Sequence, residues 1–132
     1  MVSISPVSTT RAQTILLVED EAVINDLLCD LLESEGFDVV AKANADEALE
    51  HLTQASSGVS LILTDINMPG AINGAELANH AIKKWPAIPI IVMSGLESPQ
   101  SMGISTDVVF MRKPFGMTEM IRTVHKALAS QG

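Results

Sequence analysis

The sequence predicts one α/β domain in which a parallel sheet of five strands is covered by helices on both faces. Short apolar runs of strand length alternate along the chain with segments whose apolar residues recur three and four positions apart. The apolar runs hardly alternate with polar residues, as is typical of strands buried on both faces. Strands that alternate with helices in this way form parallel sheets with right-handed crossovers.

Five apolar runs are the expected strands, and each is followed by residues that end a strand or form a turn. The expected strands are Ile15–Val18, Asp38–Lys42, Leu61–Thr64, Ile90–Met93 and Val108–Met111. The third run contains no charged residue before Asp65. That aspartate is therefore expected to close a fully buried strand.

Four further segments have the periodicity of amphipathic helices. These helices are expected to lie between Ile24 and Gly36, Asn44 and Gly58, Asn73 and Trp85, and Met117 and Leu128. Asn44 and Asn73 are each followed three residues later by glutamate, the pattern of a capping box at a helix start. Gly36 is the expected stop of the first helix.

The segment between the fourth and fifth strands, residues 95–107, differs from the others. It contains Pro99 and Gly103 and has little apolar periodicity. Proline and glycine both disfavour the interior of a helix. The sequence therefore predicts a short or irregular fourth helix in this segment.

The composition is that of a globular protein and limits the classes of partner. Of the 132 residues, 47% are hydrophobic and only 3% are aromatic, so the core is expected to be aliphatic. Sixteen acidic against eight basic residues give a net charge of −8, which argues against nucleic acid or an anionic membrane as a partner. Cys29 is the single cysteine, so we expect no disulfide, no thiolate metal site and a cytoplasmic location.

The chain is expected to have one domain with short ends. Residues 1–13 are expected to be a flexible N-terminal tail, residues 14–129 the domain, and residues 130–132 the C-terminal end. The tail lacks the basic flank and the apolar stretch of a signal peptide. No apolar run approaches the roughly 20 residues of a membrane span, so no membrane partner is expected.

Polar side chains follow four of the five expected strands. They are Glu19 and Asp20 after the first strand, Asp65 and Asn67 after the third, Ser94 after the fourth and Lys113 after the fifth. The carboxyl ends of parallel strands meet at one edge of the sheet, where such sheets bind their ligands. Each side chain taken alone has a plainer interpretation, as a turn former, a helix cap or a solvated charge. Their joint occurrence favours one site.

Three carboxylates at one edge would repel one another, and a hard divalent cation such as Mg²⁺ removes that conflict. Mg²⁺ seldom has an all-protein shell and is often completed by a phosphate oxygen. Lys113 and the Ser94 hydroxyl are suited to the remaining phosphoryl oxygens. A carboxylate with access to a phosphoryl group, a metal and a lysine can act as a nucleophile. The constellation therefore predicts that Asp65 accepts a phosphoryl group.

Four motifs in this order resemble the receiver domain of bacterial two-component response regulators. The motifs are Leu17–Glu21, Thr64–Pro69, Val92–Gly95 and Lys113–Phe115. The resemblance implies a flavodoxin-like (CheY-like) sheet in the strand order 2-1-3-4-5. It also implies a cytoplasmic signalling module that is phosphorylated by a histidine kinase or a histidine phosphotransfer protein and then acts on an unknown downstream protein. Such a module catalyses its own phosphorylation and dephosphorylation without being a turnover enzyme.

The resemblance implies roles in phosphoryl and metal binding. Asp65 matches the phosphoacceptor. Asp20 matches the direct Mg²⁺ ligand, and Glu19 matches the acid that acts on the metal largely through water. Asn67 matches the residue whose backbone carbonyl binds the metal, and Lys113 matches the partner of the phosphate.

The resemblance also implies a switch. Ser94 matches the switch hydroxyl, and Phe110 matches the aromatic rotamer switch. Plain core packing is an equally good interpretation of Phe110, because a buried strand needs apolar residues in any case. The bond between Lys113 and Pro114 is expected to be cis, as is usual in this family.

Two departures from the family pattern lie in loops. Four residues separate Pro69 from Gly74, one more than the commonest pattern. The sequence of this loop resembles that of a single-domain branch of the family found alongside kinases. The segment between Ser94 and Phe110 is shorter than usual, so a truncated or mobile fourth helix is expected there.

Three alternatives stay open. The chain could be a pseudo-receiver that binds partners without phosphorylation, or a receiver fragment of a larger regulator or hybrid kinase. The third is an enzyme of the haloacid dehalogenase class, which also combines an aspartate nucleophile with Mg²⁺ and lysine. That class has an Asp-x-Asp motif after its first strand, whereas Asp65 follows the third strand and Asn67 stands two positions later.

Overall fold

The computed structural model describes residues 12–66, 68, 70, 72–95, 103 and 108–129. Within these residues the chain forms five strands, four α-helices and one 3₁₀ turn. In the same part of the chain, no helix combines the length and the apolar content that crossing a membrane requires.

The strands form one parallel sheet in the order β2-β1-β3-β4-β5. They are β1 (Thr14–Val18), β2 (Asp38–Lys42), β3 (Leu61–Asp65), β4 (Ile90–Ser94) and β5 (Val109–Arg112). The predicted flavodoxin-like fold class and its strand order are confirmed. The central strands β3 and β4 are buried along their whole length, as their apolar sequences predict.

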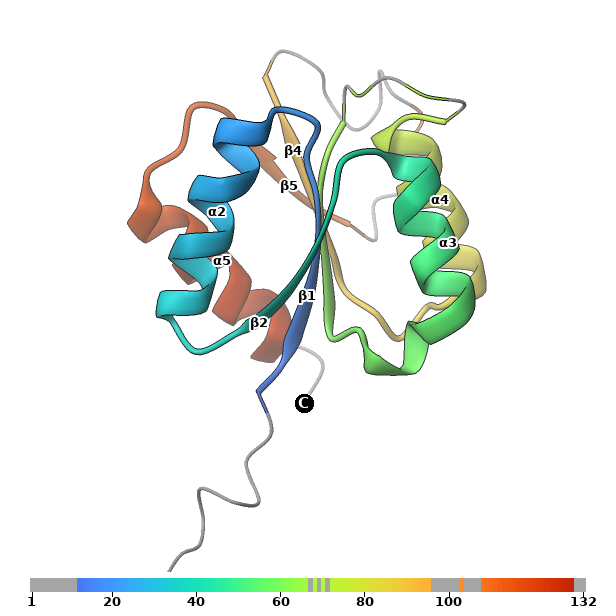
Figure 1. Ribbon diagram of the computed structural model, residues 1–132, viewed down its shortest axis with the longest axis horizontal. Helices are drawn as coiled ribbons and strands as arrows, with labels where there is room; N and C mark the ends of the chain where they lie inside the picture. The colour runs from blue at the N-terminus through green and yellow to red at the C-terminus, as the bar shows by residue number, and fades with distance from the viewer. Residues whose placement is uncertain are drawn as a thin grey trace, which may run out of the picture.

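Helices cover both faces of the sheet (Figure 1). They are α2 (Ala22–Ser34) and α5 (Met117–Ala129) on one face, and α3 (Ala45–Ala55) and α4 (Gly74–Lys84) on the other. The 3₁₀ turn η1 (Ser56–Gly58) directly follows α3. The four predicted helices are therefore all present, but two side chains of their apolar patterns, Leu27 of α2 and Met117 of α5, are exposed.

Alternate residues of each strand point to opposite faces and so build two separate cores. On β3, Leu61 and Leu63 belong to the core under α2 and α5, whereas Ile62 belongs to the core under α3 and α4. All three side chains are completely buried, and each such burial contributes about 1.5–3 kcal/mol to folding. A shift of β3 by one residue would exchange the two sets.

The helix caps follow the predicted pattern at one of two positions. At Asn73 the capping box is complete: its side chain accepts from the Glu76 N–H (2.9 Å), and Glu76 accepts from the Asn73 N–H (3.0 Å). At Asn44 only half forms, because the side chain accepts from the Glu47 N–H (2.8 Å) but Glu47 accepts from the Ala43 N–H instead (3.4 Å).

Three strands end one residue later than predicted, namely β3 at Asp65, β4 at Ser94 and β5 at Arg112. In addition, β1 begins at Thr14 instead of Ile15, and β5 begins at Val109 instead of Val108. Asp65 and Ser94 are polar, so the apolar runs stop before them, yet both lie within their strands. The reason is that the backbone pairing continues past the apolar residues. The Ile66 N–H donates to the Met93 carbonyl (3.1 Å), and the Lys113 N–H donates to the Ser94 carbonyl (2.6 Å).

The predicted short or irregular fourth helix lies largely outside the described residues. Pro99, on which that prediction partly rests, is among those not described. Gly103 is described: its φ of +69° lies in the region that favours glycine, and its carbonyl accepts from the Asn79 side chain (2.8 Å).

Candidate functional site

Asp65 lies at the carboxyl end of β3, in the middle of the sheet, and is only 6% exposed. One carboxylate oxygen accepts from the Ile66 N–H (2.7 Å). The other forms an ion pair with the ammonium group of Lys113 (3.2 Å between Oδ2 and Nζ), which follows β5. The peptide bond between Lys113 and Pro114 is cis, as predicted. The sheet therefore brings together two residues that are far apart in the sequence.

Glycine at position 74 allows α4 to begin directly against Asp65. The Gly74 N–H donates to the Ile66 carbonyl (3.0 Å). A Cβ atom at Gly74 would overlap the Asp65 carbonyl oxygen and would lie 2.8 Å from the Ile66 Cα. Both neighbours are backbone atoms of the strand end, so neither can turn away. The close contact with Gly74 thus helps to hold the end of β3 in place.

The pleat of the sheet places the charged residues on one side. Leu17 of β1, Leu63 of β3 and Met111 of β5 belong to the core under α2 and α5. By the same alternation Glu19, Asp65 and Lys113, each two positions further along the chain, face that side of the sheet edge. This shared parity is why three separate strand ends contribute to one site.

An acidic cluster surrounds the ion pair. Glu19, Asp20 and Asp65 each offer one carboxylate oxygen, and these oxygens all lie within 4.8 Å of one another. Asp20 is exposed, whereas Glu19 is only 1% exposed. The Asn25 side chain fixes the backbone beneath the cluster, because its amide donates to the carbonyls of Glu19 (3.0 Å) and Lys42 (3.4 Å).

The surroundings of the Glu19 carboxyl disfavour its negative charge. Its Oε2 accepts from the Glu21 N–H (3.1 Å), but within the described part of the chain its buried Oε1 has no hydrogen-bond partner. Burial raises the pKa of the Glu19 carboxyl from 4.5 to about 7, and the charges of Asp65 and Asp20 add to the rise. The Glu21 N–H and the charge of Lys113 act in the opposite direction. The unpaired oxygen therefore favours a proton or a cation beside it.

The raised pKa predicts that the stability of the metal-free chain depends on pH. The folded chain holds the Glu19 proton more tightly than the unfolded chain, so this group should make unfolding easier as the pH rises from 4.5 to 7. Urea unfolding at several pH values across that range, with chelator present, measures the effect. Glu19→Gln should flatten the dependence, and Glu50→Gln, a change at an exposed acid, should not. Identical pH profiles for all three chains would show that other groups dominate.

The acidic cluster fits a hard divalent cation. Its donors are carboxylate oxygens only, which is the donor type preferred by Mg²⁺ and Ca²⁺, and it contains no thiolate or imidazole. The unpaired Oε1 of Glu19 is a second observation that points the same way. Asn67, for which a metal-binding backbone carbonyl is predicted, lies outside the described residues.

Ser94 and Phe110 lie toward the other side of the sheet. Ser94 is completely buried at the end of β4, two positions after Val92 of the core under α3 and α4. Phe110 is partly buried and packs against that same core, and it pairs with Val92 in the sheet register. The structure thus places Phe110 one strand away from Ser94, and its packing agrees with both interpretations given to it.

Two residues that shape the site were missed by sequence reasoning. Gly74 was seen only as part of a loop pattern, although a glycine directly after the helix cap Asn73 could have signalled a close approach. Asn25 carried no signal, because one polar residue in an amphipathic helix is ordinary. Its bridging of two strand ends depends on the tertiary structure.

Comparison with known proteins places the geometry in context. Residues 15–125 match the family model described as response regulator receiver domain. The uncharacterized transcriptional regulatory protein YkoG of Bacillus subtilis (strain 168) is 32% identical over 121 residues, which are 89% of this chain and 52% of that protein. Sensor kinase CckA of Brucella abortus (strain 2308) is 31% identical over 121 residues, which are 89% of this chain and 13% of that protein.

A solved structure is also similar. The response regulator receiver protein from Sinorhizobium medicae WSM419 is 28% identical, with a TM-score of 0.83 over 92% of this chain and 98% of that chain. The chain spans about half of the length of the first curated relatives, or less.

Proposed function

Because the chain belongs to the family of response regulator receiver domains, we propose that it accepts a phosphoryl group on Asp65 from a phosphohistidine of a partner protein. The observation that carries the proposal is the contact of the Asp65 carboxylate with the Lys113 ammonium group beside Glu19 and Asp20. A carboxylate nucleophile, a fixed cation and a cluster that fits a divalent cation are the parts that phosphoryl transfer requires.

Each residue has a distinct role in the proposed transfer. A carboxylate oxygen of Asp65 forms a bond to phosphorus while the bond from phosphorus to the donor nitrogen breaks. Lys113 already lies 3.2 Å from that carboxylate and would neutralise an equatorial phosphoryl oxygen. The Ser94 hydroxyl would donate a hydrogen bond to another phosphoryl oxygen.

The groups that we propose to hold Mg²⁺ are Asp20, Asp65, the Asn67 carbonyl and, through water, Glu19. When bound, Mg²⁺ would supply positive charge to the acidic cluster and to the phosphoryl oxygens. Glu19 must lose its proton for its carboxylate to take part, so its pKa of about 7 matters for occupancy near neutral pH.

An exposed apolar surface adjoins the site and is suited to a protein donor. On α2, Val23 and Leu27 are 81% and 56% exposed, and on α5 Met117 is 62% exposed. Met117 also lines a groove of about 360 Å³ together with Leu31 of α2 and Ile121 of α5. Apolar side chains gathered in this way mark protein-binding surfaces. We propose that the phosphohistidine partner, a kinase or a phosphotransfer protein, docks on this side, which Asp65 and Lys113 also face.

The proposal extends to the response and is limited to the receiver domain. Phosphorylation of Asp65 would change the surroundings of Ser94 and, through the neighbouring strand, of Phe110, and so alter a surface that a downstream protein recognises. We propose a cytoplasmic location for this activity. Any activity of a longer protein that contains this domain lies beyond the proposal.

A small-molecule donor tests the function directly. Incubation with Mg²⁺ and acetyl phosphate should add one phosphoryl group to the intact chain, as measured by mass spectrometry, and chelation of the metal should prevent it. The adduct should be lost in hydroxylamine, as expected of an acyl phosphate. A chain that stays unmodified would instead favour a phosphorylation-independent binding module, and continuous phosphate release from many small esters would favour a hydrolytic enzyme.

A further inference from the structure

The connection from β3 to α4 is held against the sheet by apolar residues on either side of Gly70. It runs from Ile66, which is completely buried, to Gly74 at the start of α4. Between these two, Met68 and Ile72 are partly buried and pack against the core under α3 and α4. Gly70 is exposed and has no side chain, so apolar packing does not fix it. The middle of the connection is therefore open to a polar contact.

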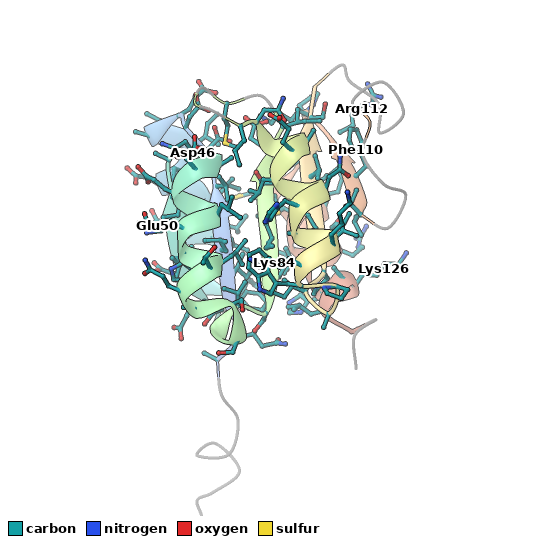
Figure 2. The ribbon with its side chains drawn as sticks, turned by 90° about the vertical axis from the view of Figure 1, so that its right-hand side faces the viewer. Asp46, Glu50, Lys84, Phe110, Arg112 and Lys126 are labelled. Atoms are coloured by element: carbon teal, nitrogen blue, oxygen red, sulfur yellow. The ribbon has the colours of Figure 1, made fainter. Side chains whose placement is uncertain are left out.

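Such a contact comes from Asp46, in the first turn of α3. A Cβ atom at Gly70 would lie only 2.6 Å from Asp46 Oδ2, and the φ of Gly70 is +126°, in the region that favours glycine. The carboxylate thus lies directly beside the glycine, in space that another residue would fill with its side chain. Figure 2 shows Asp46 at the upper end of α3, on the side of the molecule where the strands end.

Asp46 is suited to act as a fixed support. Its helix packs on the sheet through Ala45, Ala48 and Leu52, which are all completely buried. The helix dipole stabilises a carboxylate in the first turn, and a carboxylate accepts hydrogen bonds from backbone N–H groups. Among the described residues, the acidic cluster that fits a cation does not include Asp46. Its influence on the site must therefore pass through the connection that it touches.

We propose that Asp46 is a positioning residue of the phosphorylation site. Its carboxylate accepts from the backbone of the connection at Gly70, and this contact fixes the backbone that carries Asn67, three positions earlier. The inference rests on the proposed function, in which the Asn67 carbonyl binds Mg²⁺, and it adds a residue of α3 that touches neither the metal nor the phosphoryl group. Residues that orient metal ligands strengthen metal binding without being ligands themselves. The role needs an oxygen that accepts a hydrogen bond, not a negative charge.

The test measures the Mg²⁺ affinity of the unphosphorylated chain from the amide shifts of the ¹⁵N-labelled protein during titration with MgCl₂. Asp46→Ala should weaken binding by about tenfold, the lower end of the range for residues that orient metal ligands. Asp46→Asn removes the same charge but keeps an accepting oxygen, so it should bind Mg²⁺ nearly as tightly as the unchanged chain. The matched control is Glu50→Ala, which removes an exposed acid further along α3 and should leave the affinity unchanged (Figure 2).

Gly70→Ala tests the same contact from the other side. Its methyl group would displace the Asp46 carboxylate, so this change should also weaken Mg²⁺ binding. Because both changes remove one contact, the combination of Asp46→Ala with Gly70→Ala should bind little more weakly than the more severe single variant. Two independent losses would instead multiply, and that result would overturn the proposed contact.

The remaining outcomes separate this inference from its alternatives. An equal loss of affinity in Asp46→Asn and Asp46→Ala would assign the effect to charge, and an equal loss in Glu50→Ala would assign it to α3 in general. Lower stability of Asp46→Ala in urea with unchanged Mg²⁺ affinity would show a purely structural role. Each of these results overturns the inference alone, provided that the unchanged chain binds Mg²⁺ and is phosphorylated by acetyl phosphate. An unchanged chain that binds no Mg²⁺ would overturn the proposed function together with it.

Discussion

Replacement of Asp65 by asparagine should abolish the phosphoryl adduct and leave the fold intact. The amide oxygen of asparagine can still accept from the Ile66 N–H, so the local backbone keeps its hydrogen bond. The amide is a far weaker nucleophile than the carboxylate, and no acyl phosphate can form on it. Intact mass after incubation with Mg²⁺ and acetyl phosphate should therefore show the unmodified chain alone.

The expected change in stability is small because two effects oppose each other. Asp65→Asn removes the ion pair with Lys113, whose side chain is 31% exposed, and it also removes repulsion from Glu19 and Asp20. The net change in unfolding free energy should be about 1 kcal/mol or less, as measured by urea unfolding. Asp38→Asn, at an exposed acid at the start of β2, is the matched control and should be phosphorylated normally. An adduct that persists in Asp65→Asn would place the phosphoryl group elsewhere.

Replacement of Gly74 by alanine should both destabilise the protein and impair phosphorylation. The added methyl group would overlap the Asp65 carbonyl and approach the Ile66 Cα to 2.8 Å, so the end of β3 or the start of α4 must move. Overpacking against well-packed neighbours costs roughly 1–3 kcal/mol, and backbone neighbours put this case near the upper end. Urea unfolding measures the loss, and the initial rate of adduct formation reports the displacement of Asp65.

Gly58→Ala is the control for Gly74→Ala. A Cβ atom at Gly58 would meet nothing within 4 Å, and its φ is not positive, so alanine should be neutral or slightly stabilising there. The prediction for Gly74 fails if the two variants unfold at the same urea concentration, or if Gly74→Ala is destabilised while its phosphorylation, measured under folding conditions, stays normal.

The fold could be predicted because its determinants are local. Each strand is an apolar run closed by polar residues, and Asn73 begins a helix through contacts within four residues of itself. The convergence of Asp65 and Lys113 could also be predicted, since parallel strands end at one edge whatever connects them. The half-formed cap at Asn44 could not, because the choice of Glu47 between two N–H groups depends on how the chain leaves β2.

Other features of the site depend on tertiary contacts that no sequence pattern indicates. The missing partner of Glu19 Oε1 is the result of burial by neighbouring elements, as is the rise in its pKa. The overlap that excludes a side chain at Gly74 arises from the approach of α4 to β3. Sequence reasoning identified the acids and the lysine, but it could not show that Glu19 and Asp65 are buried whereas Asp20 is exposed.

The alternation of side chains along the strands also sets which length changes this domain can accept. Glu19, Asp65 and Lys113 share one side because each lies two residues beyond a side chain of the core under α2 and α5. Those core residues are Leu17, Leu63 and Met111. Inserting or deleting a single residue within β3 would turn the carboxylate toward α3 and α4, whereas a pair of residues would restore its direction. Length changes in the connection between Pro69 and Gly74 have no such parity, so that connection can vary by one residue without reorienting Asp65.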